Sequence, residues 1–434
     1  MSSSTLSRSE IAAASASLPM AAKPGLLDGL LRRFARAKLQ TQGLPLLILE
    51  AGQPVVTPPA GTRFPVVVRV NDPRFWRLLA LDGTNGAAEG FELGWWETDD
   101  LVGLVRLMSR AMEATCRIDG GLARVLMPLA RLAHRLRPNT RRGARDNIAA
   151  HYDLSNDFFK LWLDPSMMYS SALYPTPDAT LAEAQAHKLD RLCDLLDLQP
   201  GQTLCEIGSG WGALAMHAAR RGAQVTTVTI SRAQFDLAVE RIRDAGLTGL
   251  VEVRLCDYRD LTGTWDKVVS VEMVEAIGHQ QYPTYMKTIS RLLKPGGCAA
   301  LQAITIREQH YTRARDDADF IKRRIFPGSC IPSIQVLVEA AGRHSDLNLV
   351  GMYDLAPHYA RTLGDWLQAV RLRRPEILAL GFDERFLRRW EFYLAYCAGG
   401  FAERAIGCAH MLFAKPGWRD AEQAALIGTA GWEA

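Results

Sequence analysis

Paired cysteines, metal-binding clusters and long hydrophobic runs are the features that this 434-residue sequence lacks. Its eight cysteines form no Cys-x-x-Cys pair and no Cys/His cluster with zinc spacing, so we expect reduced core thiols in a cytosolic protein and no metal site. No uncharged apolar run reaches about 18 residues, so no helix is expected to span a membrane. Any membrane contact must therefore be peripheral.

A large excess of charge of one sign is missing as well, since 51 Lys and Arg residues face 47 Asp and Glu residues, for a formal net charge of +4. This excess is too small to indicate wholesale nucleic-acid binding. The chain is 48% hydrophobic and 23% charged, which is usual for a globular protein. Its length exceeds one average domain, so we expect two packed units with tails.

Two basic segments precede residue 146. Residues 26–39 predict an amphipathic helix with an apolar arc on one side and arginines on the other. The arc and the basic side comprise Leu26, Leu27, Leu30, Leu31, Phe34, Arg32, Arg33 and Arg36. Seven further arginines fall within 122–145 with no acidic residue among them. Each segment fits either a surface within its own protein or one that contacts anionic phospholipid, and the sequence leaves both open.

Between these segments, residues 44–101 alternate strand-like runs with Gly and Pro, which predicts a small α+β domain. Beyond about residue 146, strands alternate with helices. The apolar, β-branched runs are 203–207, 224–230, 250–255, 267–271 and 298–304. Such runs with helical crossovers predict an α/β fold on a parallel sheet that helices cover on both faces.

The segment 204–212, LCEIGSGWG, follows the first of these runs and precedes a predicted helix. Its Gly208, Gly210 and Gly212 allow a tight turn and close approach of a ligand at the carboxyl edge of the sheet, where open α/β sheets bind ligands. The Gly-x-Gly-x-Gly spacing after the acidic Glu206 differs from the dinucleotide fingerprint. Together with the VTISRAQ segment that follows, this loop resembles that of S-adenosylmethionine-dependent methyltransferases.

Four further segments accompany this loop in an order and spacing that resembles the cyclopropane-fatty-acyl-phospholipid synthase family. They are 151–175, 270–282, 320–333 and 381–401. The resemblance implies a seven-stranded, Rossmann-like class I methyltransferase domain over 146–420, whose last strand, within 407–417, follows a helical lipid-site insertion. It also implies an N-terminal lipid-associated α+β domain with a basic helical linker over 21–145, between a disordered tail over 1–20 and a C-terminal tail over 421–434.

Members of this family transfer the methyl group of S-adenosylmethionine to a cis double bond of a phospholipid acyl chain, so the resemblance implies a C-methyltransferase that forms a cyclopropane fatty acyl chain. Because the sulfonium is an excellent leaving group, alignment of methyl group and alkene supplies much of the rate. The alkene becomes a carbocation that aromatic faces stabilise and that must lose a proton to a base. In the family this base is a bicarbonate bound in a small polar cage.

The resemblance also implies which residues form this cage. The implied positions are Tyr152, Ser171, Glu275, Gln302, Ile304 and Tyr359. Ser171 stands where many members have cysteine and Gln302 where many have histidine, and both can still donate hydrogen bonds to bicarbonate. The Glu-Ala pair at 275–276 is similar to the plant-type and related bacterial branch of the family.

The positions that the resemblance assigns to S-adenosylmethionine are Tyr169, Ser170, Gly208, Gly210, Gly212, Thr229, Ser231, Gln234, Asp257 and Tyr258. Thr229, Ser231 and Gln234 are expected around the ribose and methionine ends of the cofactor. Asp257 and Tyr258, directly after the third strand, are expected to meet the adenine. Ser231 also suits the N-cap of the helix that follows, and the two roles are compatible.

The expected partners are an unsaturated phospholipid and an anionic membrane surface, with no nucleic acid, and the expected location is the cytoplasm at the inner face of the membrane. A homodimer is left open. Within the same chemistry, the carbocation can lose a proton from a neighbouring carbon, which leads to a methylene- or methyl-branched chain and a partner reductase.

Three other classes were weighed against this one: a small-molecule N-methyltransferase, a nucleic-acid methyltransferase and a non-catalytic lipid-binding protein. The fourth strand runs into SVEMVE, where base-methylating enzymes have an Asn/Asp-Pro-Pro-aromatic loop. The basic helices favour lipid over a small amine. The intact glycines and Glu275 disfavour a protein without catalysis.

Overall fold

The computed structural model describes residues 26–115 and 154–419, and the chain divides into two compact units between Glu97 and Thr98. The domain boundaries expected from the sequence stay a prediction, because the predicted linker falls largely on residues outside these ranges. The arginine-rich segment within 122–145 and Tyr152 lie outside them as well.

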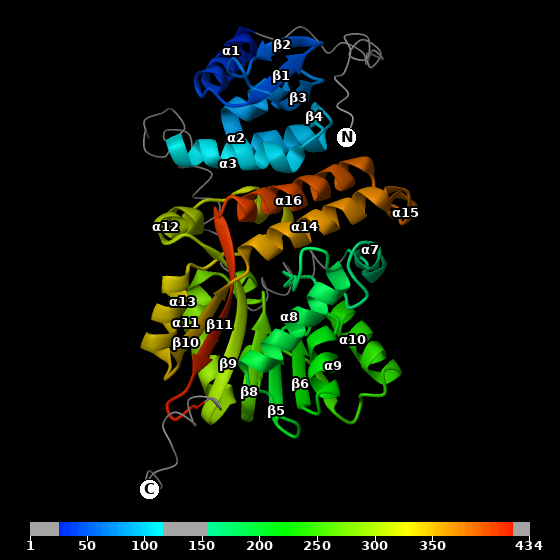
Figure 1. The fold of residues 1–434 in the computed structure, drawn as a ribbon, viewed down its shortest axis with the longest axis vertical. Helices are drawn as coiled ribbons and strands as arrows, with labels where there is room; N and C mark the ends of the chain where they lie inside the picture. Colours follow the sequence, from blue (N-terminus) through cyan, green and yellow to red (C-terminus); the bar gives the residue numbers. More distant parts are fainter. Residues whose placement is uncertain (1–25, 116–153, 420–434) are drawn as a thin grey trace. The chain divides into compact units, whose positions relative to one another are not determined.

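The first unit holds a four-stranded sheet and two helices (Figure 1). Its elements are α1 (Leu26–Thr41), β1 (Leu46–Glu50), β2 (Gln53–Val56), β3 (Val66–Val70), α2 (Phe75–Glu92) and β4 (Trp96–Thr98). The strand order is β2-β1-β3-β4, with β1 antiparallel to β2 and parallel to β3. Trp76 of α2 is fully buried, and its indole donates a 3.1 Å hydrogen bond to Glu50 Oε2.

Helix α1 turns Arg32 and Arg36 toward its own unit and leaves two residues of its apolar arc exposed. Arg32 forms a 2.8 Å ion pair with Glu50 at the end of β1, and Arg36 pairs with the same carboxylate. Leu30 and Phe34 are instead 63% and 58% exposed. Exposed apolar side chains such as these are poorly solvated by water, so they suit a nonpolar partner.

The second unit is an α/β fold, and it contains most of the described elements (Figure 1). Those that precede or form the first half of its sheet are α3 (Leu101–Thr115), α7 (Asn156–Lys160), α8 (Leu181–Leu195), β5 (Thr203–Ile207), α9 (Ala213–Arg220), β6 (Gln224–Thr229), α10 (Arg232–Asp244), β7 (Val251–Leu255) and η1 (Tyr258–Asp260). Those that follow are β8 (Trp265–Val271), η2 (Val274–Ile277), η3 (His279–Gln281), α11 (Tyr282–Leu292), β9 (Leu293–Ile306), α12 (Glu308–Asp316), η4 (Ile321–Ile325), α13 (Ile334–His344), β10 (Asn348–Asp354), α14 (Ala356–Leu372), α15 (Arg374–Ala379), α16 (Glu384–Ala402) and β11 (Ile406–Ala414).

The sheet of this unit has seven strands in the order β10-β11-β9-β8-β5-β6-β7. The strands from β9 to β7 are parallel, whereas β11 is antiparallel to both β9 and β10. The seven-stranded α/β architecture is confirmed, as is the last strand after a helical insertion, here α14 to α16. The sequence did not predict β10, an edge strand whose residues are largely exposed.

Helices cover both faces of the sheet with separate apolar cores. Side chains of α8, α9 and α10 pack on one face, where Leu192, Leu214 and Ile242 are almost fully buried. Side chains of α11 and α13 pack on the other, where Met286 and Leu337 are fully buried. Burial of apolar surface at about 25 cal/mol per Å² makes these two interfaces the main source of stability.

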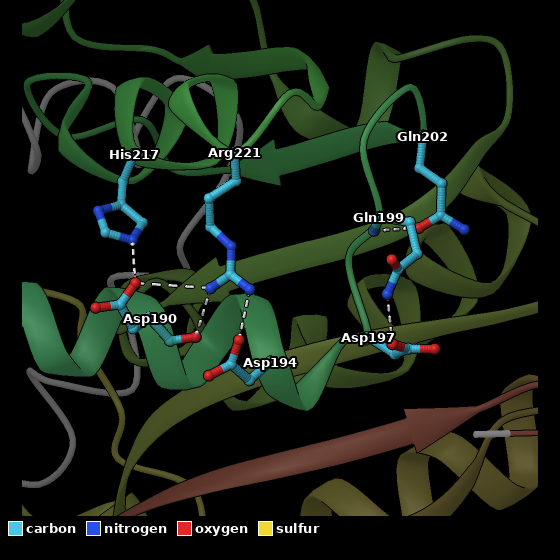
Figure 2. Close-up of polar contacts among 7 residues, drawn as sticks. All are labelled: Asp190, Asp194, Asp197, Gln199, Gln202, His217 and Arg221. Atoms are coloured by element: carbon cyan, nitrogen blue, oxygen red, sulfur yellow. Dashed lines mark hydrogen bonds and ion pairs between the residues drawn. The ribbon is translucent and has the colours of Figure 1, made fainter. Parts of the chain in front are cut away.

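Hydrogen bonds and ion pairs connect α8 to the carboxyl end of α9 (Figure 2). His217 Nε2 lies 2.9 Å from Asp190 Oδ1, and Arg221 donates to Asp194. These partly exposed pairs contribute little energy individually, but they hold the two helices in register on the sheet.

Three of the sequence's expected absences can be compared with the described ranges. No helix in them is long and apolar enough to cross a bilayer. They contain no group of three or more His, Cys, Asp or Glu residues placed to hold a metal ion. The cysteines they include are free thiols, namely Cys193, Cys205, Cys256, Cys298, Cys330, Cys397 and Cys408.

Candidate active site

The glycine loop lies at the carboxyl end of β5, as the sequence predicts. Gly208, Gly210 and Gly212 all have positive φ, at 97°, 48° and 85°, a region that residues with a side chain rarely adopt. The amides of Gly208 and Ser209 both donate to Val228 O of the neighbouring strand β6, which folds the loop over the edge of the sheet. Only glycine meets all these backbone demands together.

The surroundings of each glycine show which side of the loop is open. A Cβ at Gly208 would lie 3.3 Å from Met273, and one at Gly212 would lie 3.4 Å from Ala238. A Cβ at Gly210 would have no atom of the described residues within 4 Å. Gly212 is also the N-cap of α9, so the loop leads into the amino end of a helix, where anionic and polar ligand groups are favoured.

Thr229, Ser231 and Gln234 form one hydrogen-bonded group at the end of β6. Thr229 Oγ1 donates to Gln234 Oε1 over 2.9 Å, and the Ser231 amide donates to Thr229 Oγ1 over 3.1 Å. Ser231 is the N-cap of α10, where its hydroxyl accepts from the Gln234 amide, as the sequence predicts. Because β5 and β6 are adjacent, this group and the glycine loop share one edge of the sheet.

Asp257 and Tyr258 follow β7 on the same edge. Arg259 engages the Asp257 carboxylate through its backbone amide, at 3.0 Å, and through two guanidinium nitrogens, at 2.8 and 2.5 Å. Tyr258 is buried edge-on against Tyr285, with ring centroids 5.7 Å apart. The structure therefore orients both residues firmly, and their role toward an adenine stays a prediction.

Tyr169 and Ser170 lie on the segment that precedes α8, across from the insertion. The Tyr169 hydroxyl is 2.8 Å from that of Tyr393 on α16. The Ser170 hydroxyl accepts a 2.8 Å hydrogen bond from Lys188 Nζ. Lys188 is fully buried, and the sequence analysis did not single it out.

Three of the residues predicted to form a bicarbonate cage, Ser171, Gln302 and Tyr359, converge on a carboxylate of the protein, that of Glu272. Its Oε1 accepts from the Ser171 amide at 2.9 Å and from Gln302 Nε2 at 2.7 Å. Its Oε2 accepts from the Tyr359 hydroxyl at 2.6 Å. These donors come from the segment before α8, from β9 and from α14, so α14 closes over the carboxyl edge beside β8 and β9.

Glu275 lies beside Glu272 in the turn after β8 and has a different environment. Its Oε1 accepts from the Ile304 amide, whereas its Oε2 is buried and has no hydrogen-bond partner among the described residues. Burial, reinforced by the charge of Glu272, raises the pKa of Glu275 to about 8. Glu275 is therefore mostly protonated at neutral pH.

Burial also raises the pKa of Glu272, but hydrogen bonds from Tyr359, Ser171 and Gln302 and the charge of Lys188 oppose this shift. Lys188 has its own pKa lowered by burial to about 8, an effect that nearby carboxylates, Glu272 first among them, counteract. Hydrogen bonds and the charge of Lys188 therefore oppose the rise at Glu272, whereas the neighbouring charge of Glu272 adds to the rise at Glu275. Buried groups with such opposed shifts are typical of catalytic sites.

Aromatic rings surround this polar cluster on the side of the insertion. The Tyr359 ring stacks on Phe401 of α16 with centroids 4.3 Å apart. Tyr169 contacts Trp366 of α14 and Trp162, with centroid distances of 5.4 and 5.5 Å. Aromatic faces of this kind attract a cation and exclude water.

The sequence analysis missed Glu272, Lys188, His410 and Cys408. His410 Nε2 lies 2.9 Å from Gln302 Oε1, and Cys408 Sγ lies 3.8 Å from Glu272 Oε1. The one available signal was an acidic residue directly after a buried strand, at the edge where ligands bind. Tyr152 falls outside the described residues, so its predicted place in the cage is untested.

The two implied small molecules differ in how well these residues suit them. S-adenosylmethionine fits, because the Gly208–Gly212 loop leaves open space at Gly210 beside the polar groups of β6. Bicarbonate does not fit the cage as found, because Ser171, Gln302 and Tyr359 already donate to Glu272. A second anion beside a carboxylate would also meet charge repulsion.

Comparison with known proteins identifies what this arrangement resembles. A family model described as "Mycolic acid cyclopropane synthetase" matches residues 139–411. The chain is 38% identical over 392 residues to the tuberculostearic acid methyltransferase UfaA1 of Mycobacterium tuberculosis (strain ATCC 25618 / H37Rv), covering 88% of this chain and 89% of that protein. It is 34% identical over 363 residues to the cyclopropane-fatty-acyl-phospholipid synthase of Escherichia coli (strain K12), covering 81% and 88%.

Among solved structures, the chain matches mycolic acid cyclopropane synthase CmaA1 complexed with SAH and CTAB. The match has a TM-score of 0.59 and 32% sequence identity, and it covers 62% of this chain and 98% of CmaA1. S-adenosylhomocysteine is the product that S-adenosylmethionine leaves after methyl transfer. The expected methyltransferase fold and the expected cofactor are both confirmed.

Proposed function

Because this chain belongs to the mycolic acid cyclopropane synthetase family and is an S-adenosylmethionine-dependent C-methyltransferase, we propose that it methylates a cis double bond in an unsaturated phospholipid acyl chain, forming a cyclopropane. The observation that supports this best is the meeting of three features at one sheet edge. They are the open glycine loop, the partly buried Glu272 with its buried donors, and the aromatic lining from α14 and α16.

Each feature matches one demand of the reaction. When bound, S-adenosylmethionine supplies an electrophilic methyl group on a sulfonium leaving group, so the protein needs no nucleophile of its own. The aromatic faces around Tyr359 and Tyr169 suit the positive charge that develops on the acyl chain. Buried carboxylate oxygens beside them suit the removal of a proton. Closure by α14 and α16 excludes water that would trap the cation.

A branched product is the second candidate, and a specific observation favours it. The relative with 38% identity is named as a tuberculostearic acid methyltransferase rather than as a cyclopropane synthase. Loss of a proton from a neighbouring carbon of the same cation would give an unsaturated branched chain, which a reductase would have to saturate. The methyl transfer itself is common to both outcomes.

Mass spectrometry of lipids from cells that express the protein separates these outcomes. Derivatisation that distinguishes a three-membered ring from a double bond should place the added carbon in a ring. A branched alkene would select the second candidate. Unmodified phospholipid with methylated small amines would refute the proposal and favour a small-molecule N-methyltransferase.

We further propose that the protein reaches its substrate at an anionic membrane surface on the cytoplasmic side. The exposed Leu30 and Phe34 on α1, next to the exposed Arg33, support this idea. Apolar residues that enter the headgroup region beside a basic residue are typical of interfacial helices.

A further inference from the structure

The hydrogens of the predicted cage can be counted. Ser171 has an amide and a hydroxyl, Gln302 has two amide hydrogens and Tyr359 has one hydroxyl, which makes five donors. Three point to Glu272, from the Ser171 amide, Gln302 Nε2 and the Tyr359 hydroxyl. The Ser171 hydroxyl donates to Ala172 O at 3.0 Å, and Gln302 Nε2 also lies 3.2 Å from Ser171 O. These three residues have no donor left for a separate anion.

The backbone at Glu272 is built around this arrangement. Its φ is 49°, a left-handed conformation that glycine adopts freely and glutamate rarely does. The Glu272 amide donates to Gln302 O over 2.7 Å, which fixes the turn directly after β8. Unfavoured backbone at a ligand site is retained only where the surrounding structure holds it.

A second carboxyl group, that of Glu275, adjoins this site and has an oxygen that can still accept a hydrogen bond. Glu275 Oε2 is buried, and no atom in the described parts of the chain hydrogen-bonds to it. Glu275 as a whole is only 8% exposed, so this oxygen lies in the interior. An unpartnered oxygen of this kind marks a place where a reacting group or a proton is accommodated.

We propose, on the basis of the function proposed above, that the Glu272 carboxylate is the base that removes the proton after methyl transfer, in place of bound bicarbonate. In forming a ring, a C–H bond of the added methyl breaks, and its electron pair forms the closing C–C bond. The proton forms an O–H bond on Glu272. Methyl transfer has by then moved the positive charge from the sulfonium to a carbocation on the acyl chain, and loss of the proton neutralises it. The ionised carboxylate becomes a neutral acid and then returns its proton to water.

Wild-type protein and two variants test the assignment in buffer freed of carbon dioxide. Labelled-methyl incorporation into unsaturated phospholipid vesicles by the wild type should not change when bicarbonate is removed. Glu272→Gln should lose about 10²- to 10⁴-fold in turnover, as expected for a missing base, with S-adenosylmethionine affinity retained in titration calorimetry. Dependence of the wild type on bicarbonate, or near wild-type turnover of Glu272→Gln, would overturn the proposal.

Glu272→Gly provides a variant that the backbone accepts, because glycine suits a φ of 49°. It empties the carboxylate position and releases three donors, so bicarbonate or formate should restore part of its turnover. Glu272→Gln, whose amide fills the same space, should gain nothing. Absence of rescue in a Glu272→Gly protein that still binds S-adenosylmethionine would count against the assignment.

A binding measurement that needs no turnover tests the role of Glu272 independently of the proposed function. In thermal-shift titrations, bicarbonate or formate should raise the Tm of Glu272→Gly and leave that of the wild type unchanged. If the wild type methylates no lipid, the proposed function fails, while this titration still reports whether Glu272 occupies an anion site. An equal response of both proteins would show that it does not.

Discussion

Two glutamates three positions apart have different environments because their oxygens have different neighbours. Glu272 accepts three hydrogen bonds and lies near Lys188, whereas Glu275 accepts one from Ile304. The resemblance directed attention to Glu275 as the cage residue. Sequence alone could not direct it to Glu272, because that choice depends on three donors from distant parts of the chain. The glycine loop was predictable because its constraint is local.

The raised pKa of Glu275 predicts how stability depends on pH. The folded state holds this proton up to about pH 8, whereas the unfolded chain releases it near pH 4.5, so the free energy of unfolding falls as pH rises between these values. One such proton changes the free energy of unfolding by about 1.4 kcal/mol per pH unit. Glu275→Gln should therefore flatten the decline that urea unfolding measures from pH 5 to pH 8.

Glu240→Gln, at an exposed position on α10, is the matched control and should follow the wild-type curve. A Glu275→Gln protein with the wild-type slope would mean that Glu275 is ionised in the folded protein at neutral pH.

Gly210→Ala should weaken S-adenosylmethionine binding by about tenfold or more, or about 1.4 kcal/mol, because the added methyl projects into the open side of the loop. Gly246→Ala is the control. Gly246 also has positive φ, and its Cβ would likewise meet no atom of the described residues within 4 Å. Both variants should lose about 1–2 kcal/mol of stability through backbone strain. If titration calorimetry gave Gly210→Ala and Gly246→Ala the same affinity for S-adenosylmethionine, the loop would not be part of the cofactor site.

At the scale of elements, local pattern predicts the strands with apolar, β-branched runs better than it predicts β10. Such runs mark β5 to β9, including the edge strand β7, so they were visible in the sequence. β10 has an exposed outer surface and Gly351 in its middle, and its pairing with β11 rather than its composition makes it a strand. The insertion was predicted as helical, but the contact of α14 with Glu272 could not be, because α14 lies 87 residues along the chain from it.

This contact predicts a shift in the pH dependence of catalysis. The titratable groups that face Glu272 are Tyr359 of α14, Lys188 of α8, Cys408 of β11 and Glu275 of η2. The Tyr359 hydroxyl stabilises the ionised carboxylate, so Tyr359→Phe should raise the pKa of Glu272 and move the acid limb of the kcat profile to higher pH.

Tyr396→Phe, on α16 of the same insertion, is the control because its ring packs on Phe392 and Phe320 rather than on Glu272. Its acid limb should coincide with that of the wild type. An unshifted limb in Tyr359→Phe would argue that the proton acceptor lies elsewhere.

At the scale of the whole molecule, the alternation of strand-like and helical segments correctly predicted a large α/β unit, but the sequence did not predict which side of α1 turns inward. An amphipathic pattern distinguishes an apolar side of a helix from a basic side. Which of the two sides packs inward is decided by tertiary contacts. Here Glu50 draws Arg32 and Arg36 inward, so Leu30 and Phe34 are left exposed. The helix sequence does not reveal that a partly buried carboxylate, Glu50, lies on a neighbouring strand.

This orientation predicts that the apolar side of α1 and nearby basic charge act together on membranes. Phe34→Ser should weaken sedimentation with anionic liposomes about tenfold, since burial of such a side chain contributes about 1.5–3 kcal/mol. Val239→Ser, at an exposed position on α10, should not. Added salt should weaken binding further, because screening shortens electrostatic reach to about 8 Å at physiological ionic strength. Undiminished binding to neutral vesicles at high salt would refute the surface proposal.

The most direct test of the account supplies methyl-labelled S-adenosylmethionine and vesicles of cis-unsaturated phospholipid to the purified full-length protein. We predict that label enters the acyl chain, at the carbons of the former double bond, and that vesicles of saturated phospholipid with the same headgroup take up none. Label in the headgroup, or equal label in both kinds of vesicle, would contradict the proposal that this protein methylates an acyl-chain alkene.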